Sequence, residues 1–247
     1  MKLVFLISAV LAVAPTLSFG KNDSFESPSR QAHLLELFST QSCSSCPPAQ
    51  RWVSGLKEEK TLWKNFVPVV YHVDYWDYLG WKDPYSQKSY TRRQHGYAQQ
   101  WKSSRVYTPM FVLDGKEWRD RSTTKLNEVG SDSGVLKADR GKGLQFTVTF
   151  RPSRNRKDRL IVFAALLGNE IATNVTSGEN GGKVLKHDFL SLDLQQSNAV
   201  EKNGVYQASF DFKTAPKEVT NLGASFWITT SNGTVLQAVG GNLSKGE

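Results

Sequence analysis

The chain contains two cysteines, Cys43 and Cys46, and only two residues separate them. They follow an apolar run at 33–38 that predicts a buried strand. They precede two prolines, Pro47 and Pro48, which are tolerated in a first helical turn. A disulfide that closes so short a loop removes little entropy from the unfolded chain and adds little stability. A cysteine pair between a strand and a helix is therefore better explained by chemistry than by cross-linking.

The first part of the chain alternates between strand-like and helical patterns. After the helix that the prolines open, the expected elements are a strand at 66–73, a helix starting at Ser86, a strand at 110–113 and a weaker helix at 123–137. A CxxC pair that follows the first strand of such a pattern and opens its first helix is typical of the thioredoxin fold. We therefore expect an α/β thioredoxin-like domain over residues 21–140.

Beyond about residue 140 the chain has strand patterns only. The expected strands are 144–150, 160–167, 183–190, 205–212, 224–230 and 235–239. The last two flank a Ser-Asn-Gly tripeptide, which is a hairpin signal. We therefore expect a small all-β, antiparallel, sandwich-like domain over residues 141–247, joined to the first domain through a glycine-containing linker at 134–143.

The first twenty residues differ from the rest in character. Lys2 precedes an apolar run at 3–13, Pro15 interrupts it, and small residues follow up to Gly20. The run is too short to span a bilayer as a helix. Residues 1–20 are therefore interpreted as a cleaved signal peptide, with an uncleaved anchor as the alternative. We expect an exported protein, periplasmic or secreted, whose mature chain is not inserted in a membrane.

The formal net charge is +8, and basic residues gather at 151–159 (RPSRNRKDR). Such a stretch can mark a nucleic-acid site. Here it lies between two predicted strands, and no aromatic residues interleave with it to stack on bases. We interpret it as a solvated loop and expect no nucleic-acid partner.

The position of the cysteines predicts different roles for the two thiols. A helix N-terminus stabilises a thiolate, and a thiol attacks a disulfide only as the thiolate. Cys43, just ahead of the helix, is expected to be the exposed nucleophile with a low pKa, and Cys46 the resolving thiol. Because the chain has no third cysteine, the pair must exchange with a protein thiol or disulfide substrate and with a separate redox partner. No cofactor is required.

A second element supports redox chemistry at the cysteines. Thr108 and Pro109 precede the strand expected at 110–113. A proline there cannot donate a ladder hydrogen bond, and its peptide bond can be cis. In the thioredoxin fold a threonine–cis-proline pair before this strand faces the CxxC and presents backbone to the substrate. Thr108 and Pro109 are therefore candidate site residues, with an ordinary strand-initiating proline as the alternative.

Polar and aromatic residues follow the second predicted strand. The carboxyl ends of parallel strands meet at one edge of an open α/β sheet, so His72 and Asp74 are expected near the thiols. If the strand continues past His72, Asp74 lies on the same face as His72. Asp74 is therefore our candidate general base for deprotonating Cys46, and Asp77 is the second candidate. Trp76 and Trp81 are candidate contacts for a peptide-like substrate. A core histidine and turn-forming aspartates are the alternatives.

Several segments resemble one known family. Residues 36–48 (ELFSTQSCSSCPP) are similar to the ELFTSQGCSSCPP signature of a secreted, thioredoxin-like bacterial family known as domain of unknown function 1223. Residues 72–77 with 79–84 resemble its second signature, and 106–109 and 178–182 look like further landmarks. The resemblance implies a fold but no substrate.

The chain departs from the family signature near the thiols. Ser42 stands where the family usually has glycine, and the order of Ser39 and Thr40 is reversed. These changes affect the loop and leave both thiols in place.

Two other functions use the same residues. The cysteines could form a copper(I) or other soft-metal module, for which a histidine near the sulfurs, His72 above all, would be needed. A closed zinc site is not predicted, because the histidines are scattered. The chain could also be a non-catalytic binding protein on a thioredoxin-like fold. We take a thiol–disulfide oxidoreductase as the first hypothesis.

Overall fold

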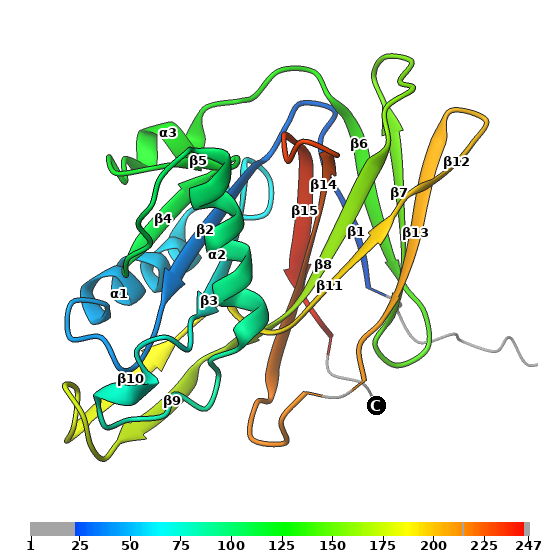
Figure 1. Ribbon diagram of the computed structural model, residues 1–247. Helices are drawn as coiled ribbons and strands as arrows, with labels where there is room; N and C mark the ends of the chain where they lie inside the picture. The colour runs from blue at the N-terminus through cyan, green and yellow to red at the C-terminus, as the bar shows by residue number, and fades with distance from the viewer. Residues whose placement is uncertain (1–22, 214, 245–247) are drawn as a thin grey trace, which may run out of the picture.

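The computed structural model describes residues 23–213 and 215–244 (Figure 1). The signal segment expected at 1–20 lies outside these residues. No helix within them is long and apolar enough to cross a membrane. The expectation of a mixed α/β protein with a separate antiparallel sheet is confirmed.

The cysteines lie in an alternating run of strands and helices, as expected. This run comprises β2 (His33–Ser39), α1 (Pro47–Gly55), β3 (Phe66–His72), α2 (Lys88–Gln100), β4 (Met110–Leu113), β5 (Lys116–Glu117) and α3 (Thr123–Asn127), with short 3-10 turns at Leu56–Glu58 and Asp77–Leu79. Strands β2 and β3 are buried along their whole length and pair in parallel, with Ser39 opposite His72. The loops that follow both strands therefore leave the same edge of the sheet.

The sheet around β2 and β3 continues into the second half of the chain. Its order is β15-β14-β8-β11-β3-β2-β4-β5. The four added strands are β8 (Leu160–Asn169), β11 (Leu190–Asn198), β14 (Asn221–Thr230) and β15 (Val235–Asn242). Strand β11 joins β3 in parallel, where Leu190 lies opposite Val70. The eight-stranded sheet therefore contains strands from both sides of residue 140. The domain boundary expected at residue 140 stays a prediction about folding units.

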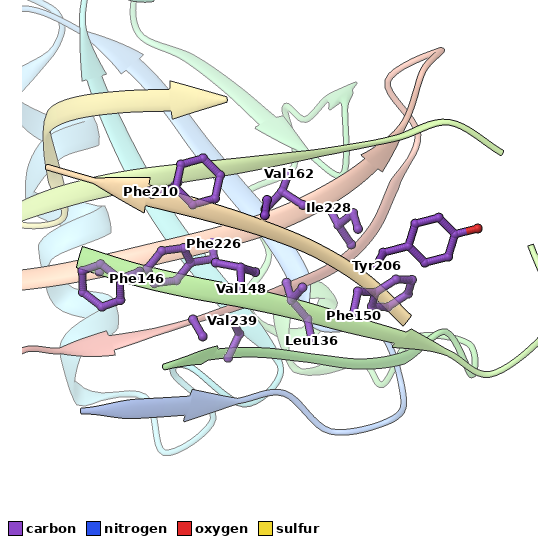
Figure 2. Close-up of a cluster of buried hydrophobic side chains, with 14 of the residues drawn as sticks. Leu136, Phe146, Val148, Phe150, Val162, Tyr206, Phe210, Phe226, Ile228 and Val239 are labelled. Carbon is purple, nitrogen blue, oxygen red and sulfur yellow. The ribbon is translucent and has the colours of Figure 1, made fainter. Parts of the chain in front are cut away.

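A five-stranded antiparallel sheet packs against this extension. Its order is β1-β6-β7-β13-β12. It contains β1 (Ser24–Glu26), β6 (Gly134–Arg140), β7 (Gln145–Pro152), β12 (Val200–Lys202) and β13 (Val205–Asp211). Inward-facing side chains of both sheets, Phe146 and Phe226 among them, form one apolar core (Figure 2). The basic residues at 151–159 lie at the end of β7 and in its connection to β8.

Three expected elements differ in the structure. The helix expected at 123–137 ends at Asn127, and the linker expected at 134–143 is largely strand β6, because Leu136 and Ala138 alternate into the core opposite β7. The strand expected at 183–190 is divided into β10 (Lys183–His187) and the start of β11. Strand β10 pairs with β9 (Ile171–Val175) as a separate two-stranded sheet. The resulting β9–β10 hairpin lies beside the loop that carries the cysteines.

Candidate functional site

The two cysteines lie where β2 passes into α1. Cys46 is the N-cap residue of α1, and its N–H donates to the carbonyl of Cys43. Both are free thiols in the structure. Cys43 is 7% exposed and Cys46 is fully buried. Cys43 is therefore less exposed than the sequence suggests, because neighbouring loops pack around it.

The surroundings of Cys43 stabilise its thiolate. Its sulfur lies 3.2 Å from Oγ of Ser45 and 3.8 Å from the carbonyl oxygen of Thr108. The hydrogen bond from the Cys46 thiol is the largest influence, burial opposes it, and the Ser45 hydroxyl adds to it. Together they lower the pKa of Cys43 from its ordinary 9.0 to about 5. Cys43 is thus largely ionised at neutral pH.

Cys46 has the opposite character. Burial raises the pKa of Cys46 far above its ordinary range, and the hydrogen bond and charge of the neighbouring Cys43 raise it further. Ser39, at the end of β2, is fully buried and acts to lower the pKa of Cys46, but burial outweighs it. The pair therefore consists of one thiolate and one thiol that donates to it.

The Thr108–Pro109 segment faces the thiols, as the sequence predicts. Its peptide bond is cis, and Pro109 directly precedes β4. Trp76 donates from Nε1 to Oγ1 of Thr108 at 2.9 Å. The rings of Trp76 and Tyr78 lie 6.1 Å apart, and Tyr78 is 75% exposed. Aromatic side chains thus extend from the thiols to the surface.

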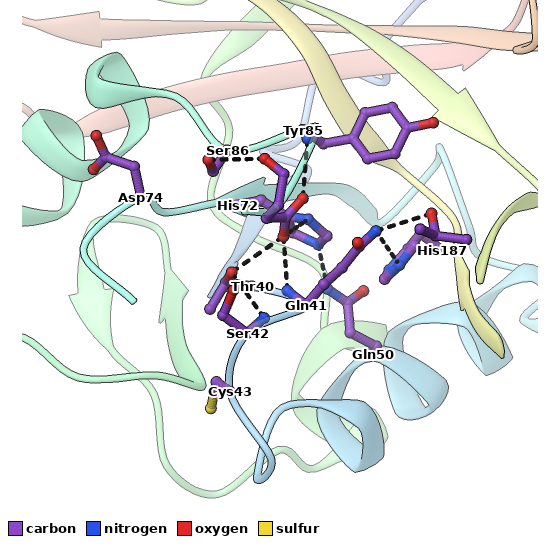
Figure 3. Close-up of polar contacts among 12 residues, drawn as sticks. Thr40, Gln41, Ser42, Cys43, Gln50, His72, Asp74, Tyr85, Ser86 and His187 are labelled. Atoms are coloured by element: carbon purple, nitrogen blue, oxygen red, sulfur yellow. Dashed lines mark hydrogen bonds and ion pairs between the residues drawn. The ribbon is translucent and has the colours of Figure 1, made fainter. Parts of the chain in front are cut away.

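A buried polar chain connects His72 with the cysteine loop (Figure 3). Nδ1 of His72 lies 2.8 Å from Oδ2 of Asp83, and neither side chain is exposed. The same carboxylate oxygen accepts from the N–H of Gln41 at 2.7 Å. Burial acts to raise the pKa of Asp83, but His72 and the N–H donors outweigh it and bring this pKa down to about 2. The loop is therefore fixed two residues before Cys43 by a buried carboxylate.

A second buried histidine lies beside the first. The rings of His72 and His187 are 4.8 Å apart and nearly perpendicular. Gln41 connects His187 with the loop that follows β3: its Nε2 lies 3.1 Å from Nε2 of His187, and its Oε1 accepts from Nε1 of Trp81. Burial, aided by the nearby His72, lowers the pKa of His187 to about 3. His187 is therefore neutral at physiological pH.

The turn of the β9–β10 hairpin holds the cysteine loop from the other side. Asn180 is fully buried, and its Nδ2 donates to the carbonyls of Gln41 and Cys43 at 2.9 Å each. A carboxylate oxygen of Glu179 accepts from the N–H of Ser44 at 2.9 Å. The 178–182 segment is thus a clamp on the loop, a role that sequence reasoning did not give it.

The aspartates after β3 bind neighbouring structure. Strand β3 ends at His72, so strand alternation does not carry over to Asp74. Asp74 accepts from Oγ1 of Thr91 on α2 at 2.6 Å, and in Figure 3 it lies apart from the network around His72. Asp77 accepts from Oγ of Ser86. The structure thus brings Asp83, rather than Asp74, into contact with the cysteine loop.

The arrangement offers no ready-made metal centre. Among residues 23–213 and 215–244, no group of three or more histidine, cysteine, aspartate or glutamate side chains is placed to hold a metal ion. Nδ1 of His72 faces Asp83, and its Nε2 lies 2.8 Å from Nε2 of Gln50. Each ring nitrogen of His72 thus already lies 2.8 Å from another polar side chain.

Comparison with known proteins gives the family. Residues 34–228 match the family model described as "Protein of unknown function (DUF1223)". The chain belongs to this family. The DUF1223 match includes strands of all three sheets, both cysteines, the Thr108–Pro109 segment and the hairpin clamp. No curated protein matches the chain.

Two solved structures share the fold of this DUF1223 protein. The protein AGR_C_4864 from Agrobacterium tumefaciens is 20% identical, with a TM-score of 0.60 over 88% of this chain and 96% of that one. HBP35 of Porphyromonas gingivalis is 14% identical, with a TM-score of 0.60 over 88% of this chain and 77% of that one. At such identities the likeness concerns the fold alone.

Proposed function

We propose that this DUF1223 protein is a thiol–disulfide oxidoreductase on a thioredoxin-like fold, with Cys43 as nucleophile and Cys46 as resolving thiol. One observation carries the proposal: the two thiols of one short loop have opposite environments. Cys43 is held as a thiolate by hydrogen bonds, whereas burial keeps Cys46 protonated. An inert local disulfide would need no such difference.

The reaction follows from that difference. The Cys43 thiolate attacks a substrate disulfide, a mixed disulfide forms, and the first substrate sulfur leaves as a thiolate. Cys46 then loses its proton and attacks the Cys43 sulfur, which closes the Cys43–Cys46 disulfide and releases the second substrate sulfur. That sulfur takes up the proton. The substrate is reduced by two electrons, and a separate dithiol partner restores the reduced pair; the reverse sequence oxidises a dithiol substrate.

The substrate is expected to bind along the Thr108 backbone. The Thr108 carbonyl borders the Cys43 sulfur, and Trp76 holds the Thr108 side chain by a hydrogen bond. An extended peptide placed there would also meet the exposed ring of Tyr78. Trp81 is held by Gln41 and fixes the loop, so we assign substrate contact to Trp76. The signal segment supports a periplasmic or secreted setting, where disulfide substrates occur.

Thiol trapping tests the proposal. In the reduced protein we expect Cys43 to be alkylated much faster than Cys46, and a Cys46→Ala variant to retain substrates as mixed disulfides through Cys43. The double variant Cys43→Ser, Cys46→Ser is the control and should retain none. Equal, slow alkylation of both thiols in the native protein would contradict the assignment. Full retention of the biological phenotype by the double serine variant would instead favour a binding protein.

A further inference from the structure

A cavity lies between α2 and the strands that extend the sheet beyond β3. Its volume is about 440 Å³, which is in the range of small-molecule sites. One wall is a single stripe of α2, whose residues recur every three or four positions: Ser89, Arg92, Arg93, Gly96, Tyr97 and Gln100. The strand wall includes two apolar side chains, Phe163 on β8 and Leu194 on β11. The cavity therefore combines a polar helix stripe with an apolar surface.

A glycine keeps the helix wall open. Gly96 lies in the interior of α2, where glycine is less favourable than alanine. Its φ is not positive, and no heavy atom of the described residues outside the backbone of its own helix lies within 4 Å of a Cβ built there. Neither the backbone conformation nor close packing requires glycine at this position. Gly96 follows Arg92 by four residues and Arg93 by three, so a side chain at 96 would occupy the space beside both arginines.

Arg93 is held in one orientation. Its Nε donates to Oε1 of the buried Glu36 at 2.6 Å, and its Nη2 donates to the hydroxyl of Tyr97 at 2.9 Å. The guanidinium carbon lies 4.9 Å from the ring centre of Phe163. The side chain as a whole is 12% exposed. A cation that is fixed in this way loses little freedom when a ligand binds to it.

The third nitrogen of this guanidinium is available to a ligand. The hydrogen bonds of Arg93 to described residues use Nε and Nη2, so Nη1 keeps its two N–H donors. Nη1 is not one of the described side-chain atoms that are both buried and unpaired. It is therefore within reach of a water-sized molecule, on a residue that lines the cavity.

The charges on the lining favour an anion. Arg92 and Arg93 line the cavity, and none of its described lining residues carries a carboxylate. Glu36 balances the charge of Arg93, so the excess positive charge comes from the exposed Arg92. Asp193 on β11 accepts from Nε2 of Gln195 at 2.9 Å and does not line the cavity. An acid group is therefore expected on the α2 wall, where arginine N–H groups match the geometry of a carboxylate.

We propose that this cavity binds a small organic acid. The carboxylate meets Arg92 and Nη1 of Arg93, and the apolar part lies against Phe163. Neither Cys43 nor Thr108 lines the cavity, and no step of the binding uses a thiol. The site is thus independent of the redox function, and the double variant Cys43→Ser, Cys46→Ser should bind the acid as the native chain does.

Benzoate is a suitable probe, because it carries one carboxylate on an apolar ring. We expect saturable binding to the full chain in an NMR titration, with shifts of the backbone resonances around Gly96. Benzamide has nearly the same shape without the charge and should bind at least about 5-fold more weakly. Arg92→Gln should weaken benzoate binding by about 3–5-fold. Arg51→Gln, at an exposed position on α1, is the matched control and should bind normally.

Gly96→Leu tests the cavity without removing a charge. Leucine favours a helix more than glycine does, so the variant should unfold at the same temperature or higher. Its side chain should occupy the cavity and weaken benzoate binding by at least about 10-fold. Gly55→Leu is the matched control, because Gly55 ends α1, also has open space at its Cβ position and lies outside the cavity. Arg93 is kept in all variants, since its removal would leave the buried Glu36 without its ion-pair partner.

Three results would overturn the proposal. One is the absence of saturable benzoate binding to the folded native chain. Another is equal affinity for benzoate and benzamide. The third is unchanged benzoate binding by folded Gly96→Leu.

Discussion

Removing the Cys46 thiol should raise the pKa of Cys43 and so shift its ionisation to higher pH. The hydrogen bond from Cys46 is the largest influence that lowers the pKa of Cys43 to about 5. A hydrogen bond to a charged group contributes about 1.5–3 kcal/mol, and a pKa change of one corresponds to about 1.4 kcal/mol. In Cys46→Ala the pKa of Cys43 should therefore rise by about 1–2. In Cys46→Ser the hydroxyl still donates, so most of the rise should be absent.

Alkylation by iodoacetamide as a function of pH measures this effect. The midpoint of the rate profile gives the pKa of Cys43, and it should move upward in Cys46→Ala. The plateau rate should increase by about 2–10-fold, because a more basic thiolate is intrinsically more nucleophilic. Ser44→Ala is the control, since its exposed side chain lies outside the thiol contacts. A native midpoint near 9, or equal midpoints in the alanine and serine variants, would refute the reasoning.

Three further predictions follow from the same contacts. Because folding lowers the pKa of Cys43 from 9.0 to about 5, its contribution to stability is complete above pH 9 and is lost as the pH falls through 5. The reduced protein should therefore lose about 2–3 kcal/mol more than Cys43→Ser between pH 7 and pH 4 in urea unfolding. Asn180→Ala removes a buried amide that donates to two carbonyls and should cost about 2–3 kcal/mol, whereas exposed Asn155→Ala should change unfolding little. With Asp74 as the base that deprotonates Cys46, Asp74→Asn should lengthen the lifetime of mixed disulfides, measured in an acid-quenched time course. Thr91→Ala is the control: it removes only the hydroxyl that donates to Asp74 and should leave that lifetime unchanged.

Local sequence patterns were sufficient for the elements that carry the thiols. The apolar run at 33–38 became β2, and α1 begins at Pro47, because burial and backbone geometry act within a few residues. The shared edge of β2 and β3 also followed from the parallel arrangement of an α/β pattern. The cis peptide before β4 was anticipated from the Thr108–Pro109 dipeptide together with its place before a strand of a thioredoxin-like pattern that carries a CxxC.

The polar network could not be predicted in the same way. Gln41, Gln50 and Asp83 look like surface residues in the sequence, and only the packing of three loops makes them buried partners. Asp83 was not among the candidate bases, because strand alternation was extended past His72 to Asp74, although β3 ends at His72. The hairpin clamp depends on contacts across more than a hundred residues, and local periodicity contains no information about such pairings.

The second half of the chain is part of the thiol site rather than an addition to it. Strand β11 covers the free edge of β3, and the β9–β10 hairpin before it supplies Asn180 to the cysteine loop. A fragment ending at residue 140 would expose that strand edge and leave the carbonyls of Gln41 and Cys43 without their buried donor. Unpaired edges and unsatisfied carbonyls are both costly. The reactive geometry of Cys43 therefore depends on strands that a division at residue 140 would remove.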